Sequence, residues 1–144
     1  MVDQRELQEK IVRYQMFEGR IKASLKRREM LITKLVEIES TLNSIEDVKN
    51  NKESEILLPL GSNVHIPGTL KDVKKIIVEI GANVALEEDM PNAKKILEKR
   101  KDILNDGLQT MEIEITNLTN EMLRLEQEIG LLMGNTKSSE VPAG

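Results

Sequence analysis

The sequence has almost no aromatic residues and no cysteine. Its 144 residues include one Tyr, one Phe and no Trp. Aromatic side chains supply much of the buried area of a compact core, so their scarcity argues against an ordinary globule. Without cysteine there is no disulfide framework and no thiolate zinc site, which agrees with an intracellular protein.

Long hydrophobic runs and an excess of basic residues are also missing. No stretch approaches the roughly 18 apolar residues that a membrane span requires. The first residues, MVDQRELQEK, are charged at once and lack the apolar segment of a signal peptide. The net charge is −4, whereas nucleic-acid binding needs a basic surface. We therefore expect a cytoplasmic protein that has neither nucleic acid nor membrane as a partner.

Recognisable catalytic motifs are absent as well. His65 is the only histidine, and with no cysteine beside it the usual nucleophilic triads and most metal sites are excluded. Gly61, Gly68 and Gly81 do not fit the spacing of a phosphate-binding loop. His65 lies between Val64 and Ile66, where an ordinary surface position on a strand is expected. We predict that the protein is not an enzyme and uses no metal or cofactor.

What the sequence does contain is charge, at 32% of residues, and aliphatic residues at helical spacing. Residues 1–50 hold no proline and a single glycine, and they are predicted to form one long helix. One apolar row repeats every seven residues, with Arg28 as its polar interruption: Leu7, Tyr14, Ile21, Leu35 and Leu42. A second row is expected at Ile11 and Leu25, and then, shifted by one residue, at Leu31, Ile38 and Ile45.

A second helix is predicted over residues 89–134, with Asp89 as its N-cap and Pro91 in its first turn. Six apolar residues fall seven apart: Leu97, Leu104, Met111, Leu118, Leu125 and Leu132. Four more follow at a spacing of four from these, with Lys101 as the polar member of that row: Leu108, Ile115, Met122 and Ile129. This is a strong coiled-coil pattern. The helix is expected to end at Gly134, with a disordered tail over residues 135–144.

Charge favours pairing of the two helices in antiparallel orientation. Residues 5–28 carry eight basic and three acidic side chains, whereas residues 112–135 carry one basic and five acidic. An antiparallel hairpin lays these segments side by side, and flanking charge selects orientation in coiled coils. Facing residue numbers then sum to roughly 140, which predicts Arg28 near Glu112 and Lys101 near Glu39.

Residues 51–88 read as four short strands in two hairpins, with the turns GSN and GAN. Pro59 cannot donate a ladder hydrogen bond, so it marks an edge or a bulge. Alternation assigns ten apolar residues to inner faces: Ile56, Leu58, Leu60, Val64, Ile66, Ile76, Val78, Ile80, Val84 and Leu86. Isolated hairpins are marginal in water, so these faces are predicted to mediate oligomerisation. The predicted fold class is mainly α, an antiparallel two-helix coiled coil joined by two β-hairpins.

This layout resembles the alpha class of prefoldin subunits. The resemblance is most specific over residues 56–88, ILLPLGSNVHIPGTLKDVKKIIVEIGANVALEE, and above all in PLG, VHIPG and IIVEIGANVALE. Two hairpins rather than one indicate the alpha class. The resemblance implies a hexamer of two alpha and four beta-type subunits, whose hairpins form a double β-barrel platform. It also implies an ATP-independent chaperone that binds unfolded client proteins at the coiled-coil tips and passes them to a group II chaperonin.

The tip, where the two chain ends meet, is predicted to bind clients through an apolar patch. Its residues are Val2, Leu7, Ile11, Ile129, Leu131, Leu132 and Met133. Leu131, Leu132 and Met133 are consecutive, so a two-helix seam cannot bury all three. Two alternatives remain open at this point. The tip can be a fraying coiled coil with ordinary seam residues, or the chain can be a structural protein that assembles with itself, even into filaments, and binds no clients.

Overall fold

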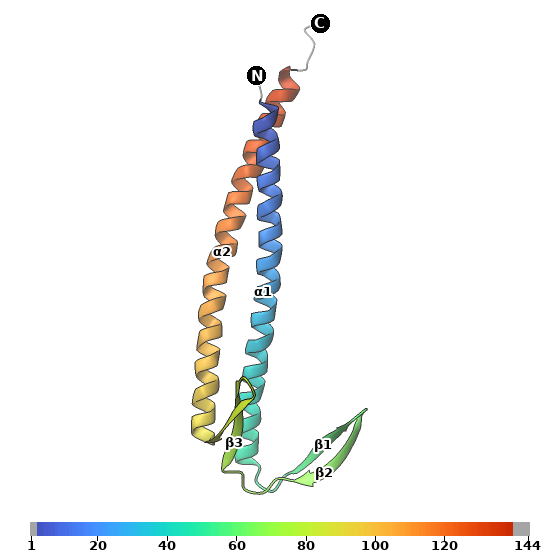
Figure 1. Cartoon of the computed structure of the whole chain (residues 1–144), viewed down its shortest axis with the longest axis vertical. Coiled ribbons are helices and arrows are strands. Elements are labelled where there is room, and N and C mark those ends of the chain that lie inside the picture. The colour runs from blue at the N-terminus through green and yellow to red at the C-terminus, as the bar shows by residue number, and fades with distance from the viewer. Residues whose placement is uncertain (1–2, 140–144) are drawn as a thin grey trace. The chain divides into compact units, whose positions relative to one another are not determined.

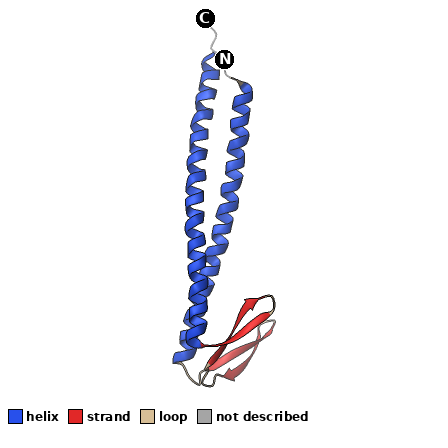
Figure 2. Ribbon diagram, turned by 60° about the vertical axis from the view of Figure 1, so that its left-hand side comes forward, coloured by secondary structure: helices blue, strands red, loops and turns tan. Residues whose placement is uncertain are grey.

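The structure is a computed structural model that describes residues 3–139, with side chains as far as residue 134. Helix α1 spans Gln4–Asn50 and helix α2 spans Met90–Ser139. Between them lie strands β1 (Glu55–Gly61), β2 (Val64–Thr69), β3 (Lys75–Gly81) and β4 (Val84–Asp89) (Figures 1 and 2). The predicted fold class, two long helices joined by two hairpins, is confirmed.

The described residues divide into two compact units. Unit 1 consists of the residues up to Ile32 and those from Asp106 onward, and unit 2 consists of Thr33–Asn105. Unit 1 therefore pairs the first part of α1 with the last part of α2. Unit 2 contains both hairpins and the helix segments that lead into and out of them.

Both helices begin at aspartate caps. The Asp3 carboxylate accepts a hydrogen bond from the backbone N–H of Arg5 at 2.9 Å. The predicted cap of α2 is confirmed, since the Asp89 carboxylate accepts a hydrogen bond from the backbone N–H of Asn92 at 2.8 Å. A side-chain oxygen at this position satisfies a backbone donor that the first helical turn leaves unpaired.

The predicted end of α2 at Gly134 is wrong. The helix continues to Ser139, so the first five residues of the predicted disordered tail have a helical backbone. One glycine inside a helix costs only about 1 kcal/mol relative to alanine, and no proline follows it before Pro142. The last five residues of the predicted tail, 140–144, lie outside the described part of the chain.

The apolar seam of α2 is confirmed, whereas one row of α1 needs correction. Every α2 position in the two predicted rows, from Leu97 to Leu132, is buried or half-buried. In α1 every position of the first predicted row is half-buried. Ile11 and Leu25, which were assigned to the second row, are exposed, at 38% and 43%. The second row instead runs without a shift, and its members are Lys10, Phe17, Ser24, Leu31, Ile38 and Ile45.

The unshifted row is physically reasonable. A strict seven-residue repeat keeps one supercoil geometry, whereas a one-residue drift would locally change the winding. Two polar residues occupy the row at little cost. Lys10 reaches an acidic partner on α2, Glu128 at 2.9 Å, and Ser24 is small enough to lie 94% buried in the seam, with 6% of its surface exposed.

Ion pairs define the antiparallel register within each unit. In unit 1 Arg28 lies 3.2 Å from Glu112, and in unit 2 Lys101 lies 3.3 Å from Glu39, as predicted. Lys94 pairs with Glu46 in unit 2. The residue numbers of these three pairs sum to 140, and those of Lys10 and Glu128 sum to 138. The predicted register of roughly 140 is confirmed in both units.

The core of unit 2 lies where the helices meet the hairpins. Ile45, Met90 and Leu97 are buried together. Partly buried residues from α1, the linker and β3 pack against them: Ile38, Leu42, Val48, Val73 and Ile76. The second hairpin is thus built onto the helices of its own chain.

The two hairpins repeat one design. In the first, Leu58 pairs with Ile66, and in the second Val78 pairs with Leu86. Each has a register shift just before its turn, between Pro59 and Gly61 and between Glu79 and Gly81. The prediction that Pro59 marks an edge or a bulge is confirmed, and the structure shows a bulge. Both turn residues of each hairpin have positive φ: Ser62, Asn63, Ala82 and Asn83. Such two-residue turns match the twist of antiparallel strands.

Candidate interaction surfaces

The ten apolar residues predicted to mediate oligomerisation are divided by the structure into two groups. Three of them are covered within the chain, with Val78 buried and Ile56 and Ile76 half-buried. The other seven are exposed: Leu58, Leu60, Val64, Ile66, Ile80, Val84 and Leu86. The strand pairing therefore forms the predicted apolar faces, and the single chain leaves most of their area uncovered.

The second hairpin is fastened to its own helices. Val78 is only 8% exposed, and Ile76 packs against the helix core. The Arg100 guanidinium on α2 donates a 2.7 Å hydrogen bond to the backbone carbonyl of Glu79. This hairpin therefore has a defined place within unit 2.

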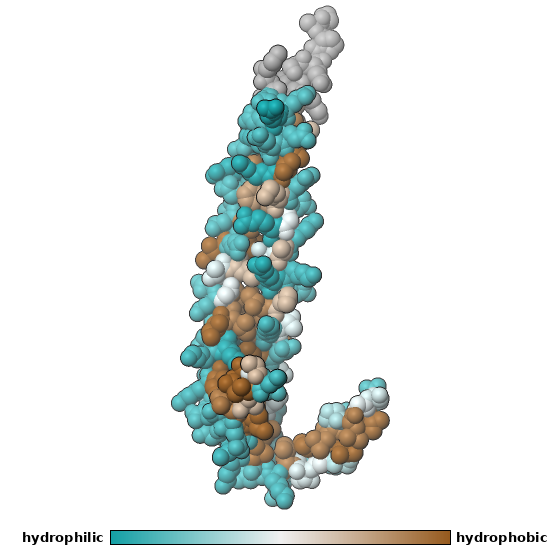
Figure 3. Space-filling view, in the orientation of Figure 1, coloured by the Kyte–Doolittle hydropathy of each residue, from teal (hydrophilic) through white to brown (hydrophobic). Residues whose placement is uncertain are grey.

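The first hairpin exposes apolar side chains on both of its faces. Leu58 and Ile66 lie opposite each other on one face, and Leu57 on the other face is 67% exposed. Figure 3 shows apolar residues gathered along this hairpin. Exposed apolar patches are typical of interaction sites, so the first hairpin is a candidate surface for assembly.

The predicted client-binding residues also fall into two groups in unit 1. Leu7, Ile129 and Leu132 are half-buried at seam positions. Ile11, Leu131 and Met133 are exposed, and Leu131 reaches 70%. Val2, the remaining predicted residue, lies outside the described residues. Some of the predicted residues therefore pack in the seam, whereas Leu131 and Met133 remain accessible to other molecules.

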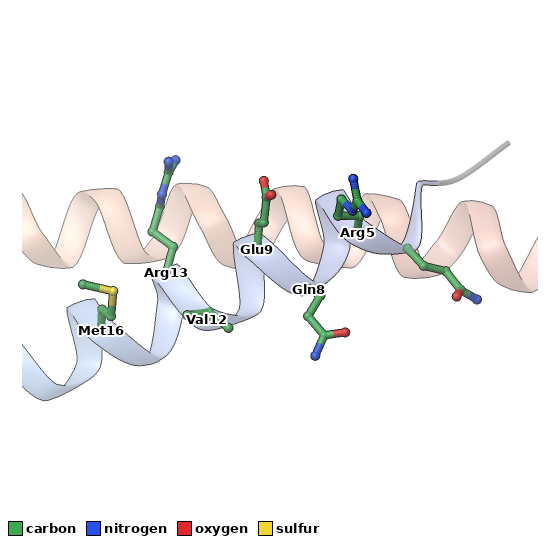
Figure 4. A pocket seen from close by; sticks show the side chains of 7 residues that line it. Arg5, Gln8, Glu9, Val12, Arg13 and Met16 are labelled. Carbon is green, nitrogen blue, oxygen red and sulfur yellow. The ribbon is translucent and has the colours of Figure 1, made fainter.

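Sequence reasoning missed two exposed apolar residues on α1, Val12 and Met16. They line a shallow surface depression together with Gln4, Arg5, Gln8, Glu9 and Arg13, all from α1 (Figure 4). A second depression, also lined by Val12, includes Leu7, Ile11 and three glutamines. The sequence feature that could have identified Val12 and Met16 is that both are apolar but fall outside the seven-residue rows.

The Lys10–Glu128 pair is the main electrostatic feature of this end of unit 1. Lys10 also approaches Glu6 at 3.6 Å. The hydrogen bond from Lys10 lowers the pKa of Glu128 below its ordinary value, and the same bond raises the pKa of Lys10. Both side chains are partly exposed, so the pair mainly selects register and contributes little stability.

The acidic side chains and the single histidine are not gathered into a metal-binding group in the described part of the chain. His65 is exposed on β2 opposite Pro59. Between residues 3 and 139, no group of three or more His, Cys, Asp or Glu side chains is placed to hold a metal ion. Over the same residues, neither helix has a stretch apolar and long enough to cross a membrane. The described residues do carry exposed apolar side chains, among them Leu58 on the first hairpin and Leu131 near the end of α2.

Comparison with known proteins agrees with this architecture. The prefoldin subunit family matches residues 5–131. The prefoldin alpha subunit of Nitrosopumilus maritimus is 28% identical over 106 residues, which cover 74% of this chain and 73% of that protein. The alpha subunit of Methanobrevibacter smithii is 28% identical over 83 residues, or 58% of this chain and 57% of that protein.

A solved structure shows the same fold. The chain aligns with the filamentous prefoldin of Methanocaldococcus jannaschii with a TM-score of 0.70 and 19% identity, over 80% of this chain and 96% of that one. The fold is that of a coiled-coil subunit whose two helices are joined by two β-hairpins with exposed apolar side chains. The chain belongs to the prefoldin family, as a subunit of its alpha class.

Proposed function

We propose that this chain is an ATP-independent holdase subunit, which binds non-native proteins through exposed apolar side chains near the helix ends and passes them to a group II chaperonin. The observation that carries the proposal is the exposure of Leu131 and Met133, at 70% and 48%. Both residues lie outside the coiled-coil seam, where polar side chains would serve equally well for solubility. An exposed apolar patch favours interaction. Methionine suits varied clients because it is flexible and polarizable.

Assembly is part of the proposal because a single helix pair binds weakly. One apolar side chain contributes roughly 1.5–3 kcal/mol when fully buried, and a client contact buries only part of it. Several helix pairs in one particle raise the effective concentration and so the overall affinity. The exposed hairpin residues, such as Leu58 and Ile66, support joining to beta-type subunits, two alpha with four beta, or to further copies of this chain.

The test is suppression of aggregation of a chemically denatured client, followed by light scattering without ATP. Leu131→Ser with Met133→Ser should reduce protection at least several-fold, because both side chains are exposed and their loss leaves the seam intact. The matched control is Ile113→Ser with Leu123→Ser, which removes two α2 side chains of similar exposure, 58% and 53%, elsewhere in unit 1. Equal protection by both double variants would place client binding elsewhere.

A second candidate function is a structural, self-assembling protein with no client role. It is favoured by the similarity to a prefoldin whose structure is filamentous, because the same hairpin faces can join identical chains. Electron microscopy and native mass spectrometry of the chain alone distinguish the two candidates. Filaments that give no protection in the scattering assay would favour the structural candidate over the holdase.

A further inference from the structure

The two prolines of the first hairpin limit what can pair with its outer edges. The Leu70 N–H donates a 2.9 Å hydrogen bond to the Ser54 carbonyl, so these two residues form a hydrogen-bonded pair of the ladder. Hydrogen-bonded and non-hydrogen-bonded pairs alternate along antiparallel strands. Pro59 on β1 and Pro67 on β2 therefore occupy non-hydrogen-bonded pairs, where backbone groups point away from the hairpin. Each outer edge of this hairpin thus lacks one donor that an added strand would need.

The second hairpin has the same register without the prolines. Each of its pairs has a counterpart in the first hairpin, so that Glu79 corresponds to Pro59 and Glu87 corresponds to Pro67. The backbone groups of Glu79 and Glu87 therefore point outward. The Glu79 carbonyl agrees with this direction, because it accepts a 2.7 Å hydrogen bond from the Arg100 guanidinium of α2. Arg100 thereby occupies part of the outer edge of β3.

The outer edge of β4 keeps its backbone groups available. Ala85 and Glu87 both lie at outward positions of β4, and both residues are exposed. Within the described residues, no backbone hydrogen bond from outside the hairpin reaches either of them. A strand edge with unpaired N–H and C=O groups is a template on which another strand can add. Among the four outer edges, β4 is the one that neither a proline nor Arg100 interrupts.

The side chains of β4 indicate which kind of strand would fit this edge. On one face Val84 and Leu86 are 48% and 39% exposed. On the other face Asp89 has Lys75 as its cross-strand neighbour, whereas no described basic side chain forms an ion pair with Glu87. Apolar pairs and pairs of opposite charge across strands stabilise a sheet. A strand that alternates apolar and basic residues therefore complements both faces of β4.

A second copy of β4 is a poor match to this edge. Glu87, Glu88 and Asp89 are consecutive, so two such strands would bring two acidic segments into one ribbon. Like charges that lie opposite each other destabilise a sheet. Charge therefore favours a strand from a different protein.

We propose that the outer edge of β4 binds an extended strand of a different protein, with basic residues beside Glu87 and apolar residues beside Leu86. The inference rests on the proposed assembly with other chains, and it adds the edge that pairs and the chemistry of the partner strand. The first hairpin has a different part in that assembly, because its exposed faces are available while its prolines weaken pairing along its edges.

Two proline variants test the edge. Glu87→Pro removes an outward N–H of β4 and gives the second hairpin the proline that Pro67 supplies in the first. Glu79→Pro is the matched control, because it repeats the arrangement of Pro59, keeps the carbonyl that Arg100 contacts and also removes one acidic side chain. Neither change removes a hydrogen bond within the hairpin, so both variants should keep the circular dichroism of the parent chain.

The probe is a fluorescein-labelled peptide of about ten residues that alternates Lys and Val, added to the full chain and followed by fluorescence anisotropy. The parent chain and Glu79→Pro should bind it with equal affinity. Glu87→Pro should bind it roughly tenfold more weakly, because the lost donor leaves a peptide carbonyl unpaired. A peptide that alternates Glu and Val should bind the parent chain at least tenfold more weakly. Glu87→Lys, which keeps the backbone N–H, should remove this preference.

Three results would overturn the proposal. The parent chain does not bind the Lys and Val peptide, or Glu87→Pro and Glu79→Pro bind it equally well. Alternatively, the chain assembles with itself and only Glu87→Pro abolishes this assembly, which would show that a second copy occupies the edge. Failure of the proposed assembly is seen separately, because native mass spectrometry of the parent chain with a beta-type subunit would then show no oligomer, whatever the peptide affinities.

Discussion

At the scale of single residues, Lys10 and Glu128 make stability depend on pH. The folded-state pKa of Glu128 is lowered, so its contribution is present at neutral pH and is lost as pH falls below about 4.5 through that lowered pKa. The pKa of Lys10 is raised, so its contribution persists up to about pH 10.5 and is lost above it. Glu128→Gln should therefore show a smaller loss of melting temperature between pH 5 and about pH 3 than the parent chain.

The control for this pH effect is Glu126→Gln, which removes a neighbouring α2 carboxylate for which no ion pair is seen within the described residues. Thermal melts followed by circular dichroism at several pH values make the comparison. The same acid dependence in Glu128→Gln as in the parent chain would mean that the ion pair adds nothing to stability.

Asp89 contributes through a backbone hydrogen bond at the start of α2. Asp89→Ala removes the acceptor for the Asn92 N–H and should lower the free energy of unfolding by about 1 kcal/mol. Asp89→Asn should keep most of the stability, because asparagine is an equally good cap. Urea unfolding of both variants measures the difference, and equal losses would show that the cap is not responsible.

At the scale of elements, the pairing of the two helices could be predicted from the sequence more completely than the identity of every residue in the seam. The α2 rows, the Asp89 cap and the register followed from periodicity and charge, because a seven-residue repeat and the sign of charge are local properties of the chain. The second α1 row was misassigned because Ile11 and Leu25 are apolar, whereas Lys10 and Ser24 are polar. Contact with the partner helix decides which residue faces inward, since Lys10 pairs with Glu128 and Ser24 is buried.

The candidate surfaces were only partly predictable for a similar reason. Strand alternation identified the apolar face of each hairpin, but it could not show that Val78 packs inside its own chain while Leu58 remains exposed. That difference depends on the helix core and on Arg100, which lies on another element. The end of α2 was placed too early because Gly134 was taken as a stop signal, although the residues after it tolerate a helix.

The antiparallel pairing of α1 with α2 can be tested by crosslinking, since the chain has no native cysteine. Arg28→Cys with Glu112→Cys replaces an ion pair of 3.2 Å, so a short bismaleimide should link the two sites within one chain. Arg28→Cys with Gln127→Cys is the control, because the second site moves about 22 Å along α2. Links only between chains in the first variant would contradict the intrachain hairpin.

At the scale of the whole molecule, the exposed face of the first hairpin should determine assembly. Leu58→Asp with Ile66→Asp places charges on an apolar face that the single chain leaves uncovered, and burying them in an interface would be costly. Native mass spectrometry should show loss of the oligomer, while helical circular dichroism stays near that of the parent. Val78→Asp is less suitable, because Val78 is buried in its own chain and the change would also unfold unit 2.

The control for assembly is Ile113→Asp, since Ile113 is an exposed apolar residue on α2 outside the hairpins. It should leave the oligomer mass unchanged. An unaltered mass in the Leu58 and Ile66 double variant would mean that the first hairpin is not the assembly element.

Client binding at Leu131 and Met133 can be measured directly by site-specific photocrosslinking to a denatured client. A photoreactive residue replaces Leu131 in one sample and Ile113 in another, both exposed side chains of α2 in unit 1. The client should be captured from position 131, without ATP, and capture from position 113 should be several-fold weaker. Equal capture from both positions, or none from position 131 while the assembly is intact, would contradict a client-binding patch at Leu131 and Met133.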